Sequence, residues 1–199
     1  MSRRLALTLA AAALATTLSF RLDPWVWRQF SYPSVYDHDW GRLLRVTGSL
    51  VFWAPLALAV SLEARARRLD WARRGWLLFL GPALAGGIGE VLKLLIRRER
   101  PNLHGGAYFY RGFSERPFDS HDLGFPSSHV VVAFAGAAIL ARFYPRAGAV
   151  AYALALGCAV SRILAQAHFT SDVVAASIMG WAVAAWLGRT MIRPNAQPV

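Results

Sequence analysis

Long apolar blocks separated by shorter polar segments divide this chain. The blocks run over Leu5–Phe20, Val46–Leu62, Trp76–Ile96, Val130–Tyr144, Ala147–Ala165 and Val173–Ile192. Their lengths approach the roughly 20 residues that an α-helix needs to cross the hydrocarbon core of a bilayer. A soluble core would instead show short runs with a regular polar face. The pattern predicts an all-α fold, a polytopic membrane bundle of about six transmembrane helices.

The chain shows neither an internal repeat nor a separate soluble segment, so residues 1–199 are interpreted as a single integral membrane domain. Its first apolar block is short for a membrane span. The small residues Ala13–Ala15 also suit signal peptidase, so a cleaved signal peptide is the alternative interpretation of residues 1–20. We interpret residues 1–20 as the first membrane span.

Two polar segments interrupt the apolar pattern. Arg21–Arg45 is rich in Trp and Tyr, which are enriched at the headgroup level of membranes, and it predicts an interfacial segment or lid. Asn102–Phe125 is the longest polar connection and combines glycines with aromatic and charged residues. We expect this second segment to form an outer loop that folds over a site.

Charge narrows the possible partners. The chain of 199 residues is 56% hydrophobic and carries a formal net charge of +11. In a soluble protein this charge would suggest nucleic acid. Here the cations lie between apolar blocks, so we expect the bilayer and an anionic lipid as partners, and no nucleic acid. The single cysteine, Cys158, cannot form an internal disulfide and is expected to pack as a small apolar residue.

The Arg-rich loop Ala64–Arg74 sets the expected orientation, because Lys and Arg in short loops favour the cytoplasmic side. With that loop inside, the polar ends of the blocks near residues 93–100, 127–129 and 161–172 all face outward. Three clusters of chemically active side chains would then share one face of the membrane.

The first cluster is "KLLIRRERP", Lys93 to Pro101. On a continuous helix, Lys93, Arg97 and Arg100 would lie one above another on one face. Such a stack of cations repels itself unless an anion lies against it. The alternative is a basic helix end whose side chains extend to the interface. We expect Arg97 and Arg98 to lie at the interface, and binding of a second phosphate or a headgroup is the alternative for these two residues.

The second cluster is "GFPSSHV", Gly124 to Val130, at the start of the fourth block. A proline and two serines before an apolar run indicate a helix start with a serine cap. A helix N-terminus offers free N–H groups and the positive end of a dipole to an anion. His129 would lie beside that anion, although an ordinary capped helix with an interfacial histidine remains the alternative.

The third cluster is "SRILAQAHFTSD", Ser161 to Asp172. Thr170 or Ser171 is expected to cap the last helix. Asp172 follows His168 by four residues, close enough for its carboxylate to hold one imidazole nitrogen. The other nitrogen would then be free to act as a nucleophile or base.

Taken together, the three clusters resemble the signatures of the type 2 phosphatidic acid phosphatase superfamily, which also includes bacterial acid phosphatases and vanadium haloperoxidases. The signatures read Lys-x6-Arg-Pro, Pro-Ser-x-His and Ser-Arg-x5-His-x3-Asp, and they span Lys93 to Asp172. This chain departs from the family pattern at Ser128, where the second signature usually has glycine. A serine keeps the backbone N–H but changes how closely the backbone fits a phosphate.

The resemblance implies phosphoryl transfer through a phosphohistidine, with neither a metal nor another cofactor. Implied catalytic residues are His168 as nucleophile, His129 as acid and base, and Asp172 as the residue that orients His168. The implied phosphate-binding residues are Lys93, Arg100, Ser127, Ser128 and Arg162.

The expected function is that of a membrane lipid phosphatase acting on a lipid monophosphate or diphosphate. Phosphatidylglycerol phosphate, undecaprenyl diphosphate and the phosphates of lipid A all suit such a site. A lipid-to-lipid phosphotransferase and a non-catalytic phospholipid-binding protein are the alternatives, while the apolar blocks argue against a soluble haloperoxidase. We expect the bacterial inner membrane, with the site facing the periplasm or cell exterior.

Three further polar residues lack signature spacing. His104 and His121 are interpreted as exposed residues of the long loop. Glu90 lies within an apolar block, where an acid needs a partner, and Lys93 or Arg97 could supply it.

Overall fold

The computed structural model describes residues 3–191, so Ile192, the last residue of the final predicted span, lies outside the described part. No β-strand forms among the described residues, which confirms the predicted all-α class. The helices are α1 (Arg3–Gln29), α2 (Asp39–Val46), α3 (Leu50–Ala66), α4 (Trp71–Ile96), α5 (Ser128–Phe143), α6 (Pro145–Leu164) and α7 (Thr170–Met191), with 3-10 turns η1 (Pro33–Asp37) and η2 (Pro101–Leu103).

Six of these helices correspond to the six predicted blocks. In the described part of the chain, α1, α4, α6 and α7 are long and apolar enough to cross a membrane. The short α2 and the longer α3 meet at a 67° bend and together form a fifth candidate span, while α5 is apolar but only 16 residues long. The chain is an integral membrane protein.

The first helix is longer than predicted. It continues beyond Phe20 through Pro24 to Gln29, so Arg21–Arg45 is not one interfacial segment. Pro24 has no N–H to donate to the carbonyl of Phe20, one turn earlier. The hydroxyl of Tyr108 lies 3.4 Å from that carbonyl oxygen and partly replaces the missing donor. Only η1 and α2 remain as the predicted segment beside the bundle.

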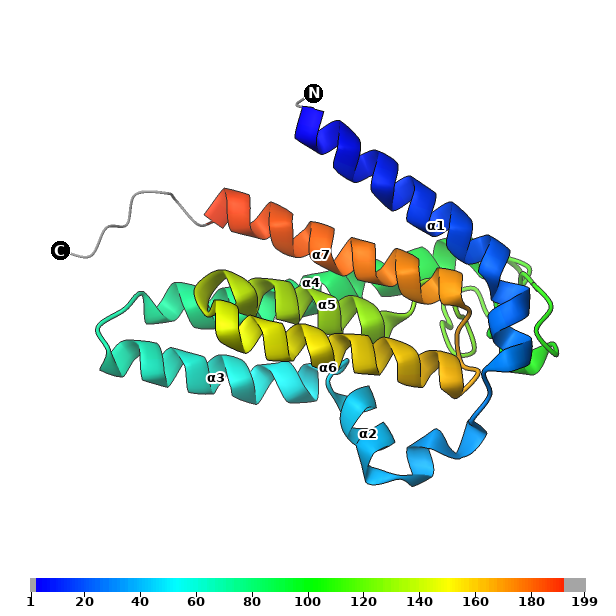
Figure 1. Ribbon diagram of the computed structural model, residues 1–199, viewed down its shortest axis with the longest axis horizontal. Coiled ribbons are helices and arrows are strands. Elements are labelled where there is room, and N and C mark those ends of the chain that lie inside the picture. Colours follow the sequence, from blue (N-terminus) through cyan, green and yellow to red (C-terminus); the bar gives the residue numbers. More distant parts are fainter. Residues whose placement is uncertain (1–2, 192–199) are drawn as a thin grey trace.

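Helix α5 lies at the centre of the bundle and packs against α4, α6 and α7 (Figure 1). Its buried residues are mostly Val, Ala and Gly, and such small side chains let helices approach closely where lipid offers no hydrophobic driving force. Gly180 of α7 illustrates the approach, because a Cβ at this position would lie 2.4 Å from the carbonyl oxygen of Val131. Helix α1 crosses α7 obliquely on the outside.

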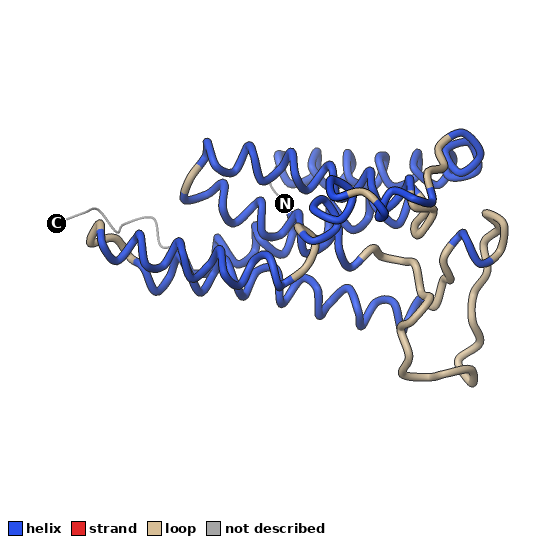
Figure 2. Tube along the Cα trace, turned by 90° about the horizontal axis from the view of Figure 1, so that it is seen from below, coloured by secondary structure: helices blue, strands red, loops and turns tan. Residues whose placement is uncertain are grey.

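The connections are divided between the two ends of the bundle. Short turns join α3 to α4 and α5 to α6 at the left of Figure 1. At the opposite end lie the C-termini of α4 and α6 and the N-termini of α5 and α7. The long loop of residues 97–127 projects from this second end, where it is drawn in tan in Figure 2.

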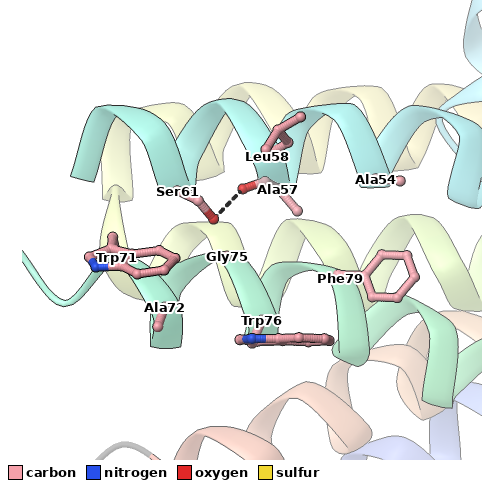
Figure 3. A pocket seen from close by; sticks show the side chains of 9 residues that line it. All are labelled: Ala54, Ala57, Leu58, Ser61, Trp71, Ala72, Gly75, Trp76 and Phe79. Carbon is pink, nitrogen blue, oxygen red and sulfur yellow. Dashed lines mark hydrogen bonds between the residues drawn. The ribbon is translucent and has the colours of Figure 1, made fainter. Parts of the chain in front are cut away.

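An apolar pocket of about 260 Å³ lies between α3 and α4 near their connecting turn (Figure 3). Trp71, Trp76 and Phe79 line it, and the hydrogen bond drawn there runs from Ser61 Oγ to the carbonyl of Ala57. Gly75 in its wall is about 27 Å along the axis of α4 from Lys93, at 1.5 Å per residue. This pocket therefore contributes nothing to the charged end of the bundle.

Candidate active site

All three sequence clusters meet at the end of the bundle that carries the long loop (Figure 1). Lys93 lies in the last turn of α4 and Arg162 in the last turn of α6. His129 is the second residue of α5, and His168 precedes α7, which contains Asp172 in its first turn. The predicted convergence of distant helix ends is therefore present in the fold.

The first cluster does not form the expected helical stack. Helix α4 ends at Ile96, four residues before Arg100, and its C-cap Arg97 adopts a left-handed conformation with φ 58°. Residues 98–100 then run in an extended form, bridged on one side to residues 109–111 and on the other to residues 122–124. In extended backbone successive side chains point to opposite faces. Arg97 and Glu99 accordingly point into the loop, whereas Arg98 and Arg100 point toward the helix ends.

Arg97 and Arg98 are both buried, so the prediction that they lie exposed at the interface is wrong. The guanidinium of Arg97 donates to backbone carbonyls of the long loop, including those of Arg111 at 3.1 Å and of Glu115. It thereby supplies hydrogen-bond donors to carbonyls of a loop that has no regular structure of its own. Arg97 organises the loop and not the anion site.

Arg98 occupies a cage of aromatic rings and forms a buried ion pair with Asp172. Its Cζ lies 4.8 to 5.2 Å from the four ring centroids of the cage. The ion pair joins Nη2 to Oδ1 of Asp172, and the same nitrogen donates to Ser171 Oγ at 2.8 Å. The rings belong to Phe20, Tyr108, Phe125 and Phe169.

The start of α7 is capped by two carboxylates, and not by Thr170 or Ser171 as expected. Asp172 accepts the N–H of Phe169 on Oδ2 at 2.7 Å, as in a capping box. Asp23, a buried residue of α1, accepts the N–H of Ser171 at 2.8 Å and its hydroxyl at 2.5 Å. Helix α1 therefore fixes the position of the helix that follows His168.

One nitrogen of His168 is held by the backbone. Nδ1 lies 2.8 Å from the carbonyl oxygen of Gly124. Because a carbonyl can only accept, Nδ1 must carry the proton, and the lone pair resides on Nε2. Asp172 Oδ2 is farther from Nδ1, at 3.5 Å. The predicted Asp172 thus lies beside His168, but its shorter contacts are to Arg98 and Phe169. The sequence did not predict that Gly124, through its carbonyl, would hold His168.

His168 lies in a strongly positive environment. Burial lowers the pKa of its imidazole well below its usual value, and the nearby charges of Arg162, Lys93 and Arg100 lower it further. The hydrogen bond to Gly124 opposes these effects but does not cancel them. At neutral pH the ring is therefore uncharged and keeps the lone pair that a nucleophile needs.

The predicted phosphate-binding donors face the same region. Among the described residues, Arg100 Nε, Arg162 Nε and Ser127 Oγ are buried and have no hydrogen-bond partner. Ser127 is the N-cap of α5, yet its side chain makes no capping bond, so the hydroxyl is free to bind elsewhere. Unpaired buried donors are costly in a folded protein. Three of them at one positive site form a ready receptor for a multivalent oxyanion.

His129 shares this environment with His168. The charges of Arg162, Lys93 and Arg45 act on it, together with His168 itself. Both imidazoles therefore lie at the same end of the bundle, within electrostatic reach of Arg162 and Lys93. Arg45 of α2 lies over the ring of Tyr36 at 5.1 Å and is a cation that sequence reasoning did not assign to the site.

The η1–α2 segment contacts the site through Tyr36. Its hydroxyl donates to the carbonyl of Ser161 at 3.2 Å and accepts a hydrogen bond from Arg162 Nη1 at 3.0 Å. The aromatic segment thus lies beside the site, as predicted from its composition. Its action as a lid stays a prediction.

Glu90 has the partner that the sequence predicted, and further partners in the side chains of Ser128 and Ser120. Lys93 Nζ lies 3.1 Å from Glu90 Oε1, and the hydroxyl of Ser128 donates to the same oxygen. Ser128, the residue that departs from the family pattern, therefore connects the start of α5 to the last turns of α4.

The loop histidines differ from each other. His121 is exposed, as predicted. His104 is partly buried, against the prediction, because Nε2 lies 2.6 Å from Oε2 of Glu99 and its ring stacks on Phe109. Within residues 3–191, no three His, Cys, Asp or Glu side chains come together as metal ligands.

Comparison with known proteins gives a consistent picture. Residues 74–195, which contain every signature residue, match the profile of the PAP2 superfamily. The fold is similar to the crystal structure of a transmembrane PAP2 type phosphatidylglycerolphosphate phosphatase from Bacillus subtilis, with a TM-score of 0.64, 18% sequence identity and 96% of both chains covered. This likeness concerns the arrangement of the helices.

Curated relatives align over part of their length. A lipid A 1-phosphatase of Rhizobium johnstonii is 32% identical over 126 residues, which is 62% of this chain and 48% of the relative. A decaprenylphosphoryl-5-phosphoribose phosphatase of Mycolicibacterium smegmatis is 34% identical over 123 residues, 61% of each chain. The chain thus spans about half to three fifths of the length of the curated relatives it matches.

Proposed function

The chain belongs to the PAP2 superfamily, also called the type 2 phosphatidic acid phosphatase superfamily, and from this premise we propose that it hydrolyses a lipid phosphate through a phosphohistidine intermediate. The observation that carries the proposal is the state of His168. Its Nδ1 donates to Gly124, its pKa is lowered, and Nε2 is therefore a neutral nucleophile among three cations.

In the first step, Nε2 of His168 attacks the phosphorus atom while the bond between phosphorus and the lipid oxygen breaks. Negative charge spreads over the three equatorial oxygens during this step. Lys93, Arg100 and Arg162 offset that charge, with further donors from the Ser127 hydroxyl and the Ser128 N–H. Removing a donor of this kind typically costs about 2.7 to 4 kcal/mol of transition-state stabilisation.

His129 protonates the departing lipid oxygen in the first step. In the second step it accepts a proton from water, whose oxygen attacks the phosphohistidine and releases inorganic phosphate. His168 regains its lone pair, and no metal enters either step.

Asp172 acts on His168 in two ways. Its carboxylate lies 3.5 Å from Nδ1 and stabilises the imidazolium-like charge that develops once Nε2 is bonded to phosphorus. Through its bond to the N–H of Phe169 it also holds the backbone next to His168. The buried ion pair with Arg98 fixes the carboxylate in both tasks.

A membrane-embedded lipid phosphate suits this site. The phosphate-binding groups lie at the ends of apolar helices, where a lipid tail can remain in the bilayer while its phosphate reaches the cations. The matched relatives are phosphatases of lipid A and of a decaprenyl-linked sugar. Phosphatidylglycerol phosphate, undecaprenyl diphosphate and lipid A phosphate are the candidates.

The proposed location is the bacterial inner membrane, with the site on the periplasmic or outer side. The Arg-rich turn between α3 and α4 lies at the end of the bundle opposite the site (Figure 1). If that turn is cytoplasmic, as its cations favour, His168 opens to the other side.

Release of inorganic phosphate by the purified protein tests the function. A panel of lipid monophosphates and diphosphates is assayed with the wild type and with His168→Ala. We expect the variant to lose turnover by at least about a thousandfold, as for removal of a covalent nucleophile. Unchanged activity in His168→Ala would refute the phosphohistidine. If the substrate phosphate is labelled and the label appears in a second lipid instead of in inorganic phosphate, the protein is a transferase.

A further inference from the structure

A groove borders the site on the side of His129. Its volume is about 500 Å³, and it lies between the α2–α3 corner and the facing surfaces of α4 and α5. Small residues such as Gly48 and Gly87 form much of its wall, and Glu90, Ser128 and His129 form its polar part. We refer to these five residues as the Glu90 groove.

The position of His129 identifies what the Glu90 groove receives. In the proposed function, on which this inference rests, His129 protonates the oxygen of the leaving group. The first atoms beyond that oxygen must therefore lie on the side of His129, and this side is the groove. For a phosphate monoester those atoms are carbon. For a diphosphate the first atom beyond the bridging oxygen is a second phosphorus.

Glu90 places a negative charge beside this part of the substrate. Its side chain is 43% exposed, while that of its partner Lys93 is 8% exposed, so the carboxylate and not the ammonium faces the groove. The hydroxyl of Ser128 donates to the same carboxylate and holds it in the groove wall. Its charge acts on Arg100 as well as on Lys93.

A second phosphate in the Glu90 groove would meet this carboxylate at close range. Like charges a few ångströms apart in a partly dry site repel each other strongly enough to lower kcat/KM for the diphosphate about tenfold. Arg45, an exposed cation whose charge reaches His129, is not in the lining of the groove and lies over Tyr36. An uncharged leaving group avoids the repulsion.

We propose that Glu90, fixed by Ser128 and Lys93, is a specificity-determining residue that restricts this enzyme to lipid monophosphates and excludes lipid diphosphates. The substitution of serine at position 128 for the usual family glycine gives this chain the hydroxyl that holds the carboxylate. The preferred substrates are phosphate monoesters whose leaving group is uncharged near the scissile oxygen.

Farnesyl monophosphate and farnesyl diphosphate form a matched pair of probes, since they share one tail and differ by one phosphate. Initial rates of phosphate release give kcat/KM for each, measured for the wild type, Glu90→Gln and Glu63→Gln. Glu63 of α3 is the control, because it is likewise paired with a cation one turn away but lies near the opposite end of the bundle.

The wild type is expected to prefer the monophosphate by at least about tenfold. In Glu90→Gln the ratio of diphosphate to monophosphate activity should rise by about tenfold, with no change in Glu63→Gln. A wild type that prefers the diphosphate overturns the inference, and this measurement does not depend on how the variant folds. An unchanged ratio in Glu90→Gln overturns it too, provided that His168→Ala is inactive. Activity in His168→Ala contradicts the proposed function itself.

A leucine at Gly87 tests whether the leaving group occupies the groove. A Cβ at this position meets no atom within 4 Å, so a side chain here begins in open space. Gly87→Leu is expected to raise KM for the farnesyl substrates and to leave KM for methyl phosphate near the wild-type value. Equal effects on both substrate types would place the leaving group elsewhere.

Discussion

Arg98 and Asp172, 74 residues apart, form an ion pair in which both side chains are buried. Arg98 lies on the extended segment after α4, and Asp172 lies in the first turn of α7. The pair therefore joins the loop that covers the site to the helix that positions His168. Breaking a buried pair on one side typically costs about 3 to 5 kcal/mol, because the remaining charge stays buried without a partner.

Removing both charges should thus be less harmful than removing either one. We expect Arg98→Met and Asp172→Asn each to lower thermal stability markedly, and the double variant to recover a large part of the loss. Thermal unfolding in detergent measures this. Additive losses in the double variant would show that the two side chains do not act as a pair.

Catalysis should respond differently to the same variants. Asp172→Asn is expected to lose rate and to retain most lipid binding, since the phosphate-binding cations are unchanged. The double variant should regain stability without regaining kcat, because in the proposed mechanism Asp172 also stabilises the charge on His168. Recovery of both together would assign Asp172 a purely structural role.

Replacing His129 should expose the intermediate. With 4-nitrophenyl phosphate the leaving group needs little protonation, so in the proposed mechanism His129→Ala should still form the phosphohistidine but hydrolyse it slowly. General acid–base assistance is typically worth about 10² to 10⁴ in rate. Rapid-mixing experiments should therefore give a burst of nitrophenolate close to one equivalent per protein. Slow release of nitrophenolate with no burst would show that hydrolysis of the phosphohistidine is not the step that His129 assists.

The helical spans, and the gathering of the three clusters at one end of the bundle, were predictable from sequence, because apolar block length and signature spacing both report local constraints. What the sequence did not predict arises from tertiary contacts. Helix α1 passes through Pro24 because Tyr108 and Asp23 meet across 85 residues. Arg98 was assigned to the interface because a helix was assumed, and only the extended backbone after Ile96 turns it toward Asp172.

The effect of pH should depend on Arg162. The pKa of His168 is lowered by burial first and by the charge of Arg162 next, so the free imidazole persists as pH falls through its ordinary value of about 6.5. Because the unfolded chain binds this proton and the folded protein does not, the associated stability is complete above about pH 6.5 and is lost as pH falls further.

Arg162→Gln removes one of the lowering charges and should shift the acid limb of the kcat/KM profile to higher pH. The second ionisation of the substrate phosphate contributes equally to both profiles and cancels in the comparison. Arg189→Gln, at the far end of α7, is the control and should leave the acid limb in place. If the acid limb of the kcat/KM profile does not move in Arg162→Gln, a group other than His168 determines that limb.

Tyr36 offers a local test of the segment beside the site. Its hydroxyl bonds to Arg162 and to the carbonyl of Ser161, so Tyr36→Phe should let the guanidinium move. Loss of one such bond is worth about 1 kcal/mol, or about a fivefold fall in kcat/KM. Tyr32→Phe removes a comparable hydroxyl that bonds only to exposed His38 and should change little. Equal effects would indicate disturbance of the segment as a whole.

Glu99 is expected to keep the long loop closed. Burial raises the pKa of its carboxyl, but hydrogen bonds from His104 and Arg111 outweigh burial and leave it below its usual value. The stabilisation is thus present above about pH 4.5 and decreases as pH falls. Glu99→Gln deprives the buried Arg111 of its ionic partner, so trypsin should cleave the loop faster at neutral pH. Glu115→Gln removes an exposed charge from the same loop and serves as the control, and equal cleavage of the two variants would contradict a specific role for Glu99.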